Sequence, residues 1–210
     1  MRNSLRWIVL FLLGAVVGTA LDRLHVIYGV LDYPGSAPFA QRLWVPPLFG
    51  GAALLFVFGH RNFRGESRHA KAERSLLRVG LFIALFALVY FATAALHGHP
   101  LLLLIGLPLG MVPLLWGGPP RRYLHVAAIA LGGTLFEIAL VSIGGFRYLA
   151  PGLLPVPLWL PGLYLYAALA TREIDLAFFA PAAEHERSPR APTEGSGGAS
   201  QLQTNATGRP

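Results

Sequence analysis

The sequence predicts an all-α membrane protein: a bundle of six transmembrane helices in which the first and last helical hairpins (helices 1–2 and 5–6) form an internal parallel repeat. Three observations lead to this prediction. Apolar residues make up 54% of the chain and charged residues only 13%, whereas about 25% of the residues of a soluble domain are charged. The apolar residues gather in six long runs. Finally, residues 18–54 align without a gap to residues 133–169.

Each apolar run is interpreted as one transmembrane helix. Most runs approach the ~20 residues that a helix needs to cross ~30 Å of hydrocarbon, and a helix satisfies its backbone polar groups within the segment. The fourth run is short and contains Pro108 and Pro113, which predicts a kink. The six predicted spans are residues 5–25, 43–60, 76–96, 101–117, 122–144 and 156–173.

The basic residues predict the orientation of these spans. The net charge is +7, but all the Lys and Arg residues except Arg23, Arg42 and Arg147 fall on one side of the six spans. Because basic segments stay in the cytoplasm, both termini are predicted to be cytoplasmic. Topology thus accounts for the positive charge, and we expect no nucleic-acid partner. The basic run 61–78 could also hold anionic lipid head groups.

The chain divides into two regions by composition. Residues 1–180 contain the six spans and form the transmembrane domain. Residues 181–210 are rich in Pro, Gly, Ser and Thr, which is typical of a disordered tail, here cytoplasmic. The chain has no cysteine, which excludes disulfides and thiolate metal sites. We expect neither a metal site nor a cofactor.

The repeat places an acidic residue in each copy. Asp22 aligns with Glu137, and both lie inside apolar runs. A carboxylate within a span costs ~2.5–3.5 kcal/mol on insertion scales, so it normally faces a cavity or a partner. We therefore expect both acids to point into the bundle at equivalent heights. His25 lies one helical turn beyond Asp22 and can share its face.

Several roles for these acids remain open from the residues alone. They could bind the polar group of a lipid in a cavity with apolar walls. They could be structural, paired with Arg23, Arg147 or the backbone. They could also be the general acid and base of an isoprenoid- or carotenoid-modifying enzyme, such as a hydratase or cyclase. A ligand-free scaffold is the fourth alternative. The spans contain no Ser/His/Asp spacing or phosphate-binding loop, so no catalytic residue is assigned.

Three segments resemble the Insig (insulin-induced) family of six-span membrane proteins. The resemblance implies a bundle that encloses a lipid- or sterol-binding pocket and has a regulatory or sensing role. The family pattern has polar amides at the places of Asp22 and Glu137, so the acids change the chemistry of the cavity wall. The segments that carry the resemblance are Leu21–Val26, Trp44–Pro47 with Gly50, and Phe146–Tyr148 followed by Trp159–Pro161.

The resemblance also implies where a ligand would bind. The pocket would draw on the first, second and fifth spans, and the two outer-loop tryptophans would hold the hairpins at the membrane interface. The expected ligand-binding residues are Asp22, His25, Trp44, Pro46, Gly50, Phe136, Glu137, Tyr148 and Trp159.

The resemblance bears on partners and location as well. Eukaryotic members associate with sterol-sensing proteins of the endoplasmic reticulum through a loop that has an acidic residue after its proline. This chain has Pro151-Gly152 there, which puts that kind of partner in doubt. We expect a membrane lipid or sterol-like molecule as ligand and allow for a homo-oligomer. The lack of cysteine and the short tail favour a bacterial plasma membrane over the endoplasmic reticulum.

Overall fold

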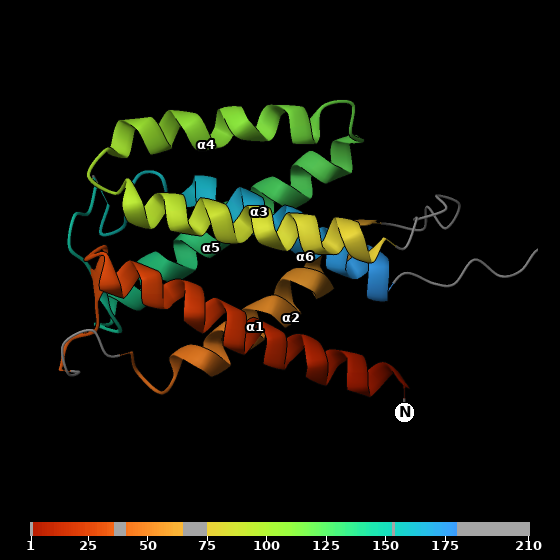
Figure 1. Cartoon of the computed structure of the whole chain (residues 1–210), viewed down its shortest axis with the longest axis horizontal. Coiled ribbons are helices and arrows are strands. Elements are labelled where there is room, and N and C mark those ends of the chain that lie inside the picture. Colours follow the sequence, from red (N-terminus) through yellow and green to blue (C-terminus); the bar gives the residue numbers. More distant parts are fainter. Residues whose placement is uncertain (1, 36–40, 65–74, 153, 180–210) are drawn as a thin grey trace, which may run out of the picture. The chain divides into compact units, whose positions relative to one another are not determined.

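The computed structural model describes residues 2–35, 41–64, 75–152 and 154–179, and these residues are almost entirely helical. The prediction of an all-α protein is thus confirmed, apart from one short antiparallel ribbon in which Leu31 faces Tyr148 and Asp32 faces Arg147. The elements in chain order are α1 (Arg2–Ile27), β1 (Leu31–Asp32), α2 (Val45–Arg64), α3 (Leu76–Ala95), α4 (Pro100–Leu115), α5 (Pro120–Ser142), β2 (Arg147–Tyr148) and α6 (Leu160–Phe178) (Figure 1).

Three helices of the described part are long and apolar enough to cross a membrane, namely α1 from Ser4, α3 and α5. Helix α4 is as apolar, but it has only 16 residues, which span ~24 Å at 1.5 Å per residue. Pro108 and Pro113 lie inside it, as the sequence indicated. Helix α6 carries Arg172, Glu173 and Asp175 close to its C-terminal end.

The two ends of the helices differ in chemistry. We call the end that carries β1 and β2 the ribbon end. The opposite end carries the start of α1, where Arg6 donates a hydrogen bond of 2.7 Å to the carbonyl of Phe178 at the end of α6. The guanidinium of Arg61, near the end of α2, lies 5.5 Å from the ring centre of Trp7. We call this end, with Arg6, Arg61, Arg78, Arg122 and Arg172, the basic end.

Glycines allow two pairs of helices to approach closely. A Cβ atom at Gly18 of α1 would lie 2.4 Å from the ring of Phe49 on α2. A Cβ atom at Gly133 of α5 would lie 2.4 Å from the ring of Tyr164 on α6. Any larger residue at either position would push the helices apart, which is the usual reason for small residues in membrane-helix interfaces.

Helix α6 is the most buried helix in the described part of the chain. Its interior residues include Leu160, Ala168 and Leu169, each at most 1% exposed, and it packs against α2, α3, α4 and α5. Two predictions, the disordered tail 181–210 and most of the basic run 61–78, fall outside the described residues.

Candidate functional site

The carboxyl group of Asp22 lies inside the protein near the ribbon end of α1. The residue is 4% exposed. Its Oδ2 atom accepts a hydrogen bond of 2.7 Å from the Tyr33 hydroxyl and one of 2.6 Å from Nε2 of Gln41. Gln41 also donates to the carbonyl of Thr19 at 3.0 Å, which fixes its amide across the last turns of α1. Asp22 thus sits among neutral donors.

The carboxyl group of Glu137 has an equivalent setting in α5. Its two oxygens accept hydrogen bonds from the hydroxyl of Tyr148, in β2, and from that of Tyr164 in α6, the latter at 2.6 Å. Tyr148 follows Glu137 by 11 residues, and Tyr33 follows Asp22 by the same 11. Each acid is therefore held by the tyrosine that follows its own helix.

Aromatic side chains pack beside the acid clusters. The imidazole of His25 bonds to the Thr93 hydroxyl at 3.0 Å, stacks on Tyr90 at 4.3 Å and meets Trp159 edge-on at 5.8 Å. The ring of Phe146 links the tyrosines of the two clusters, since its centre lies 6.0 Å from that of Tyr33 and 5.5 Å from that of Tyr148. The two carboxyl groups therefore belong to one polar region.

The two tyrosines of the ribbon, Tyr33 and Tyr148, keep their phenol protons and so act as hydrogen-bond donors. Burial, reinforced by the charge of Asp22, raises the pKa of Tyr33 above its ordinary value. Burial, reinforced by Glu137, raises the pKa of Tyr148 in the same direction. Because a phenol already has a pKa near 10 in water, both hydroxyls stay protonated at physiological pH and donate to the acids.

The structure brings together most of the residues that the sequence singled out. Asp22, His25, Glu137, Tyr148 and Trp159 belong to the region just described. Trp159 packs inside, at 2% exposure, and not at the surface.

The remaining expected residues lie outside the polar region of Asp22 and Glu137. Trp44 meets the ring of Tyr33 at 5.8 Å. Pro46 lies in the first turn of α2, and a Cβ atom at Gly50 would lie 2.7 Å from Phe11. Phe136 is 49% exposed, whereas its neighbour Glu137 is partly buried.

The expected site residues did not include Tyr33, Gln41, Tyr90 and Tyr164, which the structure places at the acid clusters. The first had a signal, since the alignment of 18–54 with 133–169 pairs Tyr33 with Tyr148. The others had none: Tyr164 aligns with Phe49, and Tyr90 lies outside the repeat.

Two surface grooves are formed by described residues. One has a volume of about 440 Å³ and lies between α4, α5 and α6. The other has a volume of about 590 Å³ and lies over α1 and α2, beside Trp7 and Phe58. Neither of these two grooves is lined by Asp22 or Glu137.

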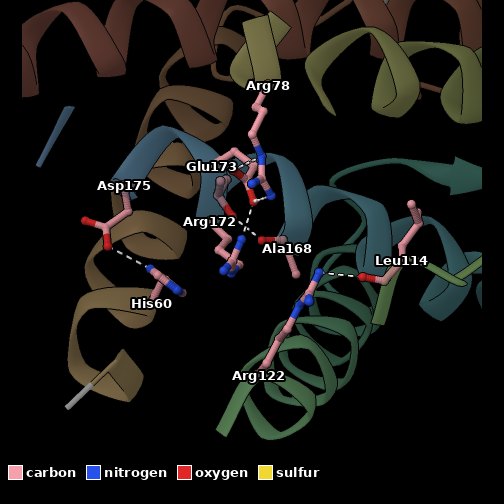
Figure 2. A network of polar contacts seen from close by, with 9 residues as sticks. His60, Arg78, Leu114, Arg122, Ala168, Arg172, Glu173 and Asp175 are labelled. Atoms are coloured by element: carbon pink, nitrogen blue, oxygen red, sulfur yellow. Dashed lines mark hydrogen bonds and ion pairs between the residues drawn. The ribbon is translucent and has the colours of Figure 1, made fainter. Parts of the chain in front are cut away.

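A second polar cluster occupies the basic end (Figure 2). Nδ1 of His60 lies 2.7 Å from Oδ2 of Asp175, and both residues are buried. The ring of His125 meets that of His60 at 4.9 Å. Beside them, Glu173 pairs with Arg78 and Arg172. In the described part of the chain no group of three or more His, Asp or Glu residues is arranged to hold a metal ion.

Comparison with known proteins gives these clusters a family context. No model of a known protein family matches the chain. A curated relative, an INSIG protein homolog from Mycolicibacterium vanbaalenii, is 31% identical over 147 residues, which is 67% of this chain and 70% of the relative. The chain belongs to the Insig family. The resemblance noted in the sequence is thereby confirmed.

Solved structures support the Insig fold. Two crystal structures of the Insig homologue MvINS from Mycobacterium vanbaalenii, one of them a cross-linked trimer, align with a TM-score of 0.69. The aligned parts cover 89% of this Insig-family chain and 97% of each solved chain, with 24% and 23% sequence identity. At that identity the likeness shows a shared fold, that of an all-α membrane protein.

Proposed function

We propose that this Insig-family protein binds an amphipathic lipid or sterol-like molecule within the membrane, between α1, α2 and α5, and that binding serves regulation and not catalysis. The observation that carries the proposal is the pair of acid clusters at Asp22 and Glu137. They form a compact polar region surrounded by apolar helices, which is the usual design of a small-molecule site. A hydroxyl group of the ligand would donate to a carboxyl oxygen.

The position of the two ribbon tyrosines supports an entry route. Tyr33 follows β1 directly and Tyr148 belongs to β2. The hydroxyls that these two tyrosines donate to the acids therefore come from the ribbon and not from a packed helix. The ribbon has only two residues in each strand. A shift of this ribbon would withdraw both hydroxyls without disturbing a helix, and the ligand would take their place at the acids.

We infer that all six helices cross the membrane, with both termini in the cytoplasm and residues 181–210 as a cytoplasmic tail. Support comes from the basic end, where most of the described arginines gather at the start of α1, α3 and α5 and the end of α2 and α6, whereas only Arg23, Arg42 and Arg147 lie toward the ribbon end. Basic residues of this kind stay on the cytoplasmic side. The bacterial origin of the relative supports a bacterial plasma membrane.

We further infer that α1–α2 and α5–α6 are two copies of one hairpin, related by an approximate two-fold axis. Asp32 bonds to Arg147 and His60 bonds to Asp175, and each pair is separated by 115 residues, the offset of the sequence repeat. In a two-fold arrangement only residues beside the axis contact their own equivalents. The two pairs, one at each end of the protein, therefore support an axis that runs between the two acid clusters.

A homo-oligomer is compatible with this proposal. The mycobacterial relative MvINS has been crystallised as a cross-linked trimer, and we propose that this chain also self-associates. Light scattering of the detergent-solubilised protein would measure its mass; a monomer at all concentrations would contradict this part.

The test of the proposed site is to purify the protein in a mild detergent and identify bound lipids by mass spectrometry. We expect one lipid or sterol-like species in stoichiometric amount with the wild type. Asp22→Asn and Glu137→Gln should lose most of it. Asp32→Asn is the matched control, because Asp32 is a partly exposed acid at the same end whose amide can still accept from Arg147. The control should keep the ligand.

Other results would identify the alternatives. A protein without any stoichiometric lipid would be a scaffold. An enzyme would release a chemically altered lipid, and Glu137→Gln would retain the substrate while stopping its conversion. Either result would overturn the proposal.

A further inference from the structure

Three arginines from three helices surround one buried carboxylate at the basic end. Glu173 of α6 is 5% exposed. Its Oε2 lies 3.3 Å from Nε of Arg78 in α3, and its Oε1 is bonded to Nη1 of Arg172. Arg122 of α5 reaches toward Leu114, and the guanidinium groups of Arg122 and Arg172 lie on the same side of α6 (Figure 2).

Among the described residues, the charges in this cluster do not balance. The charges of Arg78 and Arg172 both act on Arg122 and oppose its own, and within the described part of the chain Glu173 is the one carboxylate that acts on it in the other direction. The second acid nearby, Asp175, is engaged by His60 at 2.7 Å and lies apart from Arg122 (Figure 2). Arginine does not lose its proton in proteins. The cluster therefore has an excess of positive charge in a half-buried position, where an anion would be favourable.

Arg122 still has unused hydrogen-bond capacity. Its Nη2 atom donates to the carbonyl of Leu114, at the end of α4. Its Nε–H is shut off from solvent and has no hydrogen-bond partner among the described residues. One reading is that Arg122 only caps α4. That reading leaves the excess charge and the buried donor without an explanation.

An apolar groove opens beside this arginine. It has a volume of about 440 Å³, and its walls include Met111 and Leu115 of α4, Leu165 of α6 and Tyr123 of α5. Trp116, which is 81% exposed, lies at its rim. Leu115 and Tyr123 are the chain neighbours of Leu114 and Arg122. A Trp and a Tyr beside a charged cluster are typical of the membrane–water interface.

We propose that this corner binds an anionic phospholipid, with an acyl chain in the groove and the phosphate among Arg122, Arg172 and Arg78. Guanidinium groups bind phosphate through paired hydrogen bonds, and the buried Nε–H of Arg122 would gain an acceptor. The groove favours a lipid over a free phosphate. The site lies at the opposite end from the acid clusters and is independent of the function proposed for them.

The test is native mass spectrometry of the purified full chain, titrated with phosphatidylglycerol and with phosphatidylcholine of the same acyl chains. We expect the wild type to prefer phosphatidylglycerol. Arg122→Gln should weaken phosphatidylglycerol binding about fivefold, the usual contribution of one basic residue near a membrane surface, and leave phosphatidylcholine unchanged. The matched control is Arg121→Gln, an exposed arginine on the same helical turn, which should keep the preference.

Two further variants test the site without removing an arginine. Glu173→Gln removes the competing carboxylate, so phosphatidylglycerol should bind several-fold more tightly. Val112→Trp fills the groove, since Val112 is 48% exposed and lines it. It should weaken binding of long-chain phosphatidylglycerol but not of a six-carbon short-chain form. These variants decide the matter even if Arg122→Gln does not fold.

Four results would overturn the proposal. Equal losses in Arg121→Gln and Arg122→Gln would mean attraction by surface charge alone. Displacement of the lipid by millimolar inorganic phosphate would indicate a free-anion site. A destabilised Arg122→Gln with unchanged lipid preference would mean that Arg122 only caps the C-terminus of α4. Weaker phosphatidylglycerol binding in Glu173→Gln would contradict the argument from excess positive charge. Asp22→Asn should leave phosphatidylglycerol binding intact, so this site and the acid clusters can fail separately.

Discussion

Both ends of the molecule hold two carboxyl groups among the helices, but the groups that donate hydrogen bonds to these carboxyls differ. At the ribbon end, Asp22 and Glu137 accept hydrogen bonds from neutral groups, three phenols and one amide. At the basic end, Glu173 and Asp175 are held by arginine and histidine. A neutral donor costs less to bury than a cation and can be exchanged for a ligand hydroxyl without leaving a charge behind. The comparison suggests an exchangeable site at one end and a fixed electrostatic anchor at the other.

The largest effect is expected from His60→Leu at the basic end. Removing one partner of a buried pair leaves a costly carboxylate, so we expect a loss of about 3 kcal/mol in unfolding free energy. Unfolding in SDS, followed by circular dichroism, measures it. The double variant His60→Leu/Asp175→Leu should recover most of the loss, because an apolar pair replaces the buried one. No recovery would show that Asp175 acts through other contacts.

Alkaline pH should act on the ribbon end. Because the folded-state pKa values of Tyr33 and Tyr148 are raised, the folded state keeps these protons when the unfolded chain has lost them. Their stabilising contribution is complete below about pH 10, the pKa of an unperturbed tyrosine. Above it the contribution falls by about 1.4 kcal/mol per pH unit and per tyrosine.

Thermal unfolding between pH 8 and 11 tests this pH dependence. The double variant Tyr33→Phe/Tyr148→Phe should show a shallower fall than the wild type. An identical slope in both proteins would mean that these hydroxyls titrate normally in the folded state.

Single tyrosine variants compare the two acid clusters with each other. Tyr33→Phe leaves Asp22 with Gln41, and Tyr148→Phe leaves Glu137 with Tyr164. Each should cost about 1–2 kcal/mol, the contribution of a buried hydrogen bond to a polar or charged acceptor. Tyr28→Phe is the control, an exposed tyrosine at the same end. Losses that differ strongly between the two variants would argue against equivalent hairpins.

The smallest effect is expected from Arg147→Gln. Arg147 pairs with Asp32 at 2.9 Å, but its side chain is 65% exposed, and exposed ion pairs contribute only about 0–1 kcal/mol. Unfolding measured at low and at high salt would check this, because the wild type should lose the small advantage in salt. A loss of unfolding free energy as large as that of His60→Leu would mean that the ribbon contributes strongly to the stability of the fold.

Much of the fold followed from local patterns. Long apolar runs at 5–25, 76–96 and 122–144 predicted helices that the structure contains as α1, α3 and α5, because hydrocarbon leaves the backbone no other way to satisfy its polar groups. The antiparallel ribbon was not predicted. Its strands have two residues each, too few for any alternation to be recognised.

The candidate site was predicted in part. The burial of Asp22 followed from the cost of a carboxylate in a span. Its partner Gln41 did not, because a polar residue in a loop carries no sign of where its side chain points. The arginines around Glu173 were assigned only to topology. Their convergence depends on contacts between residues as distant as Arg78 and Glu173.

The sequence by itself determined the helical class, the membrane setting, the presence of two acids inside apolar runs and the family, because each rests on composition or on a pattern within a few consecutive residues. The tertiary structure alone decided which donors meet each acid and which charges gather at the basic end. Helix α1 is apolar on nearly all its faces, so its pattern does not specify its rotation. The packing of Gly18 against Phe49 and of Gly133 against Tyr164 sets the rotation of both hairpins, and with it the direction in which Asp22 and Glu137 point.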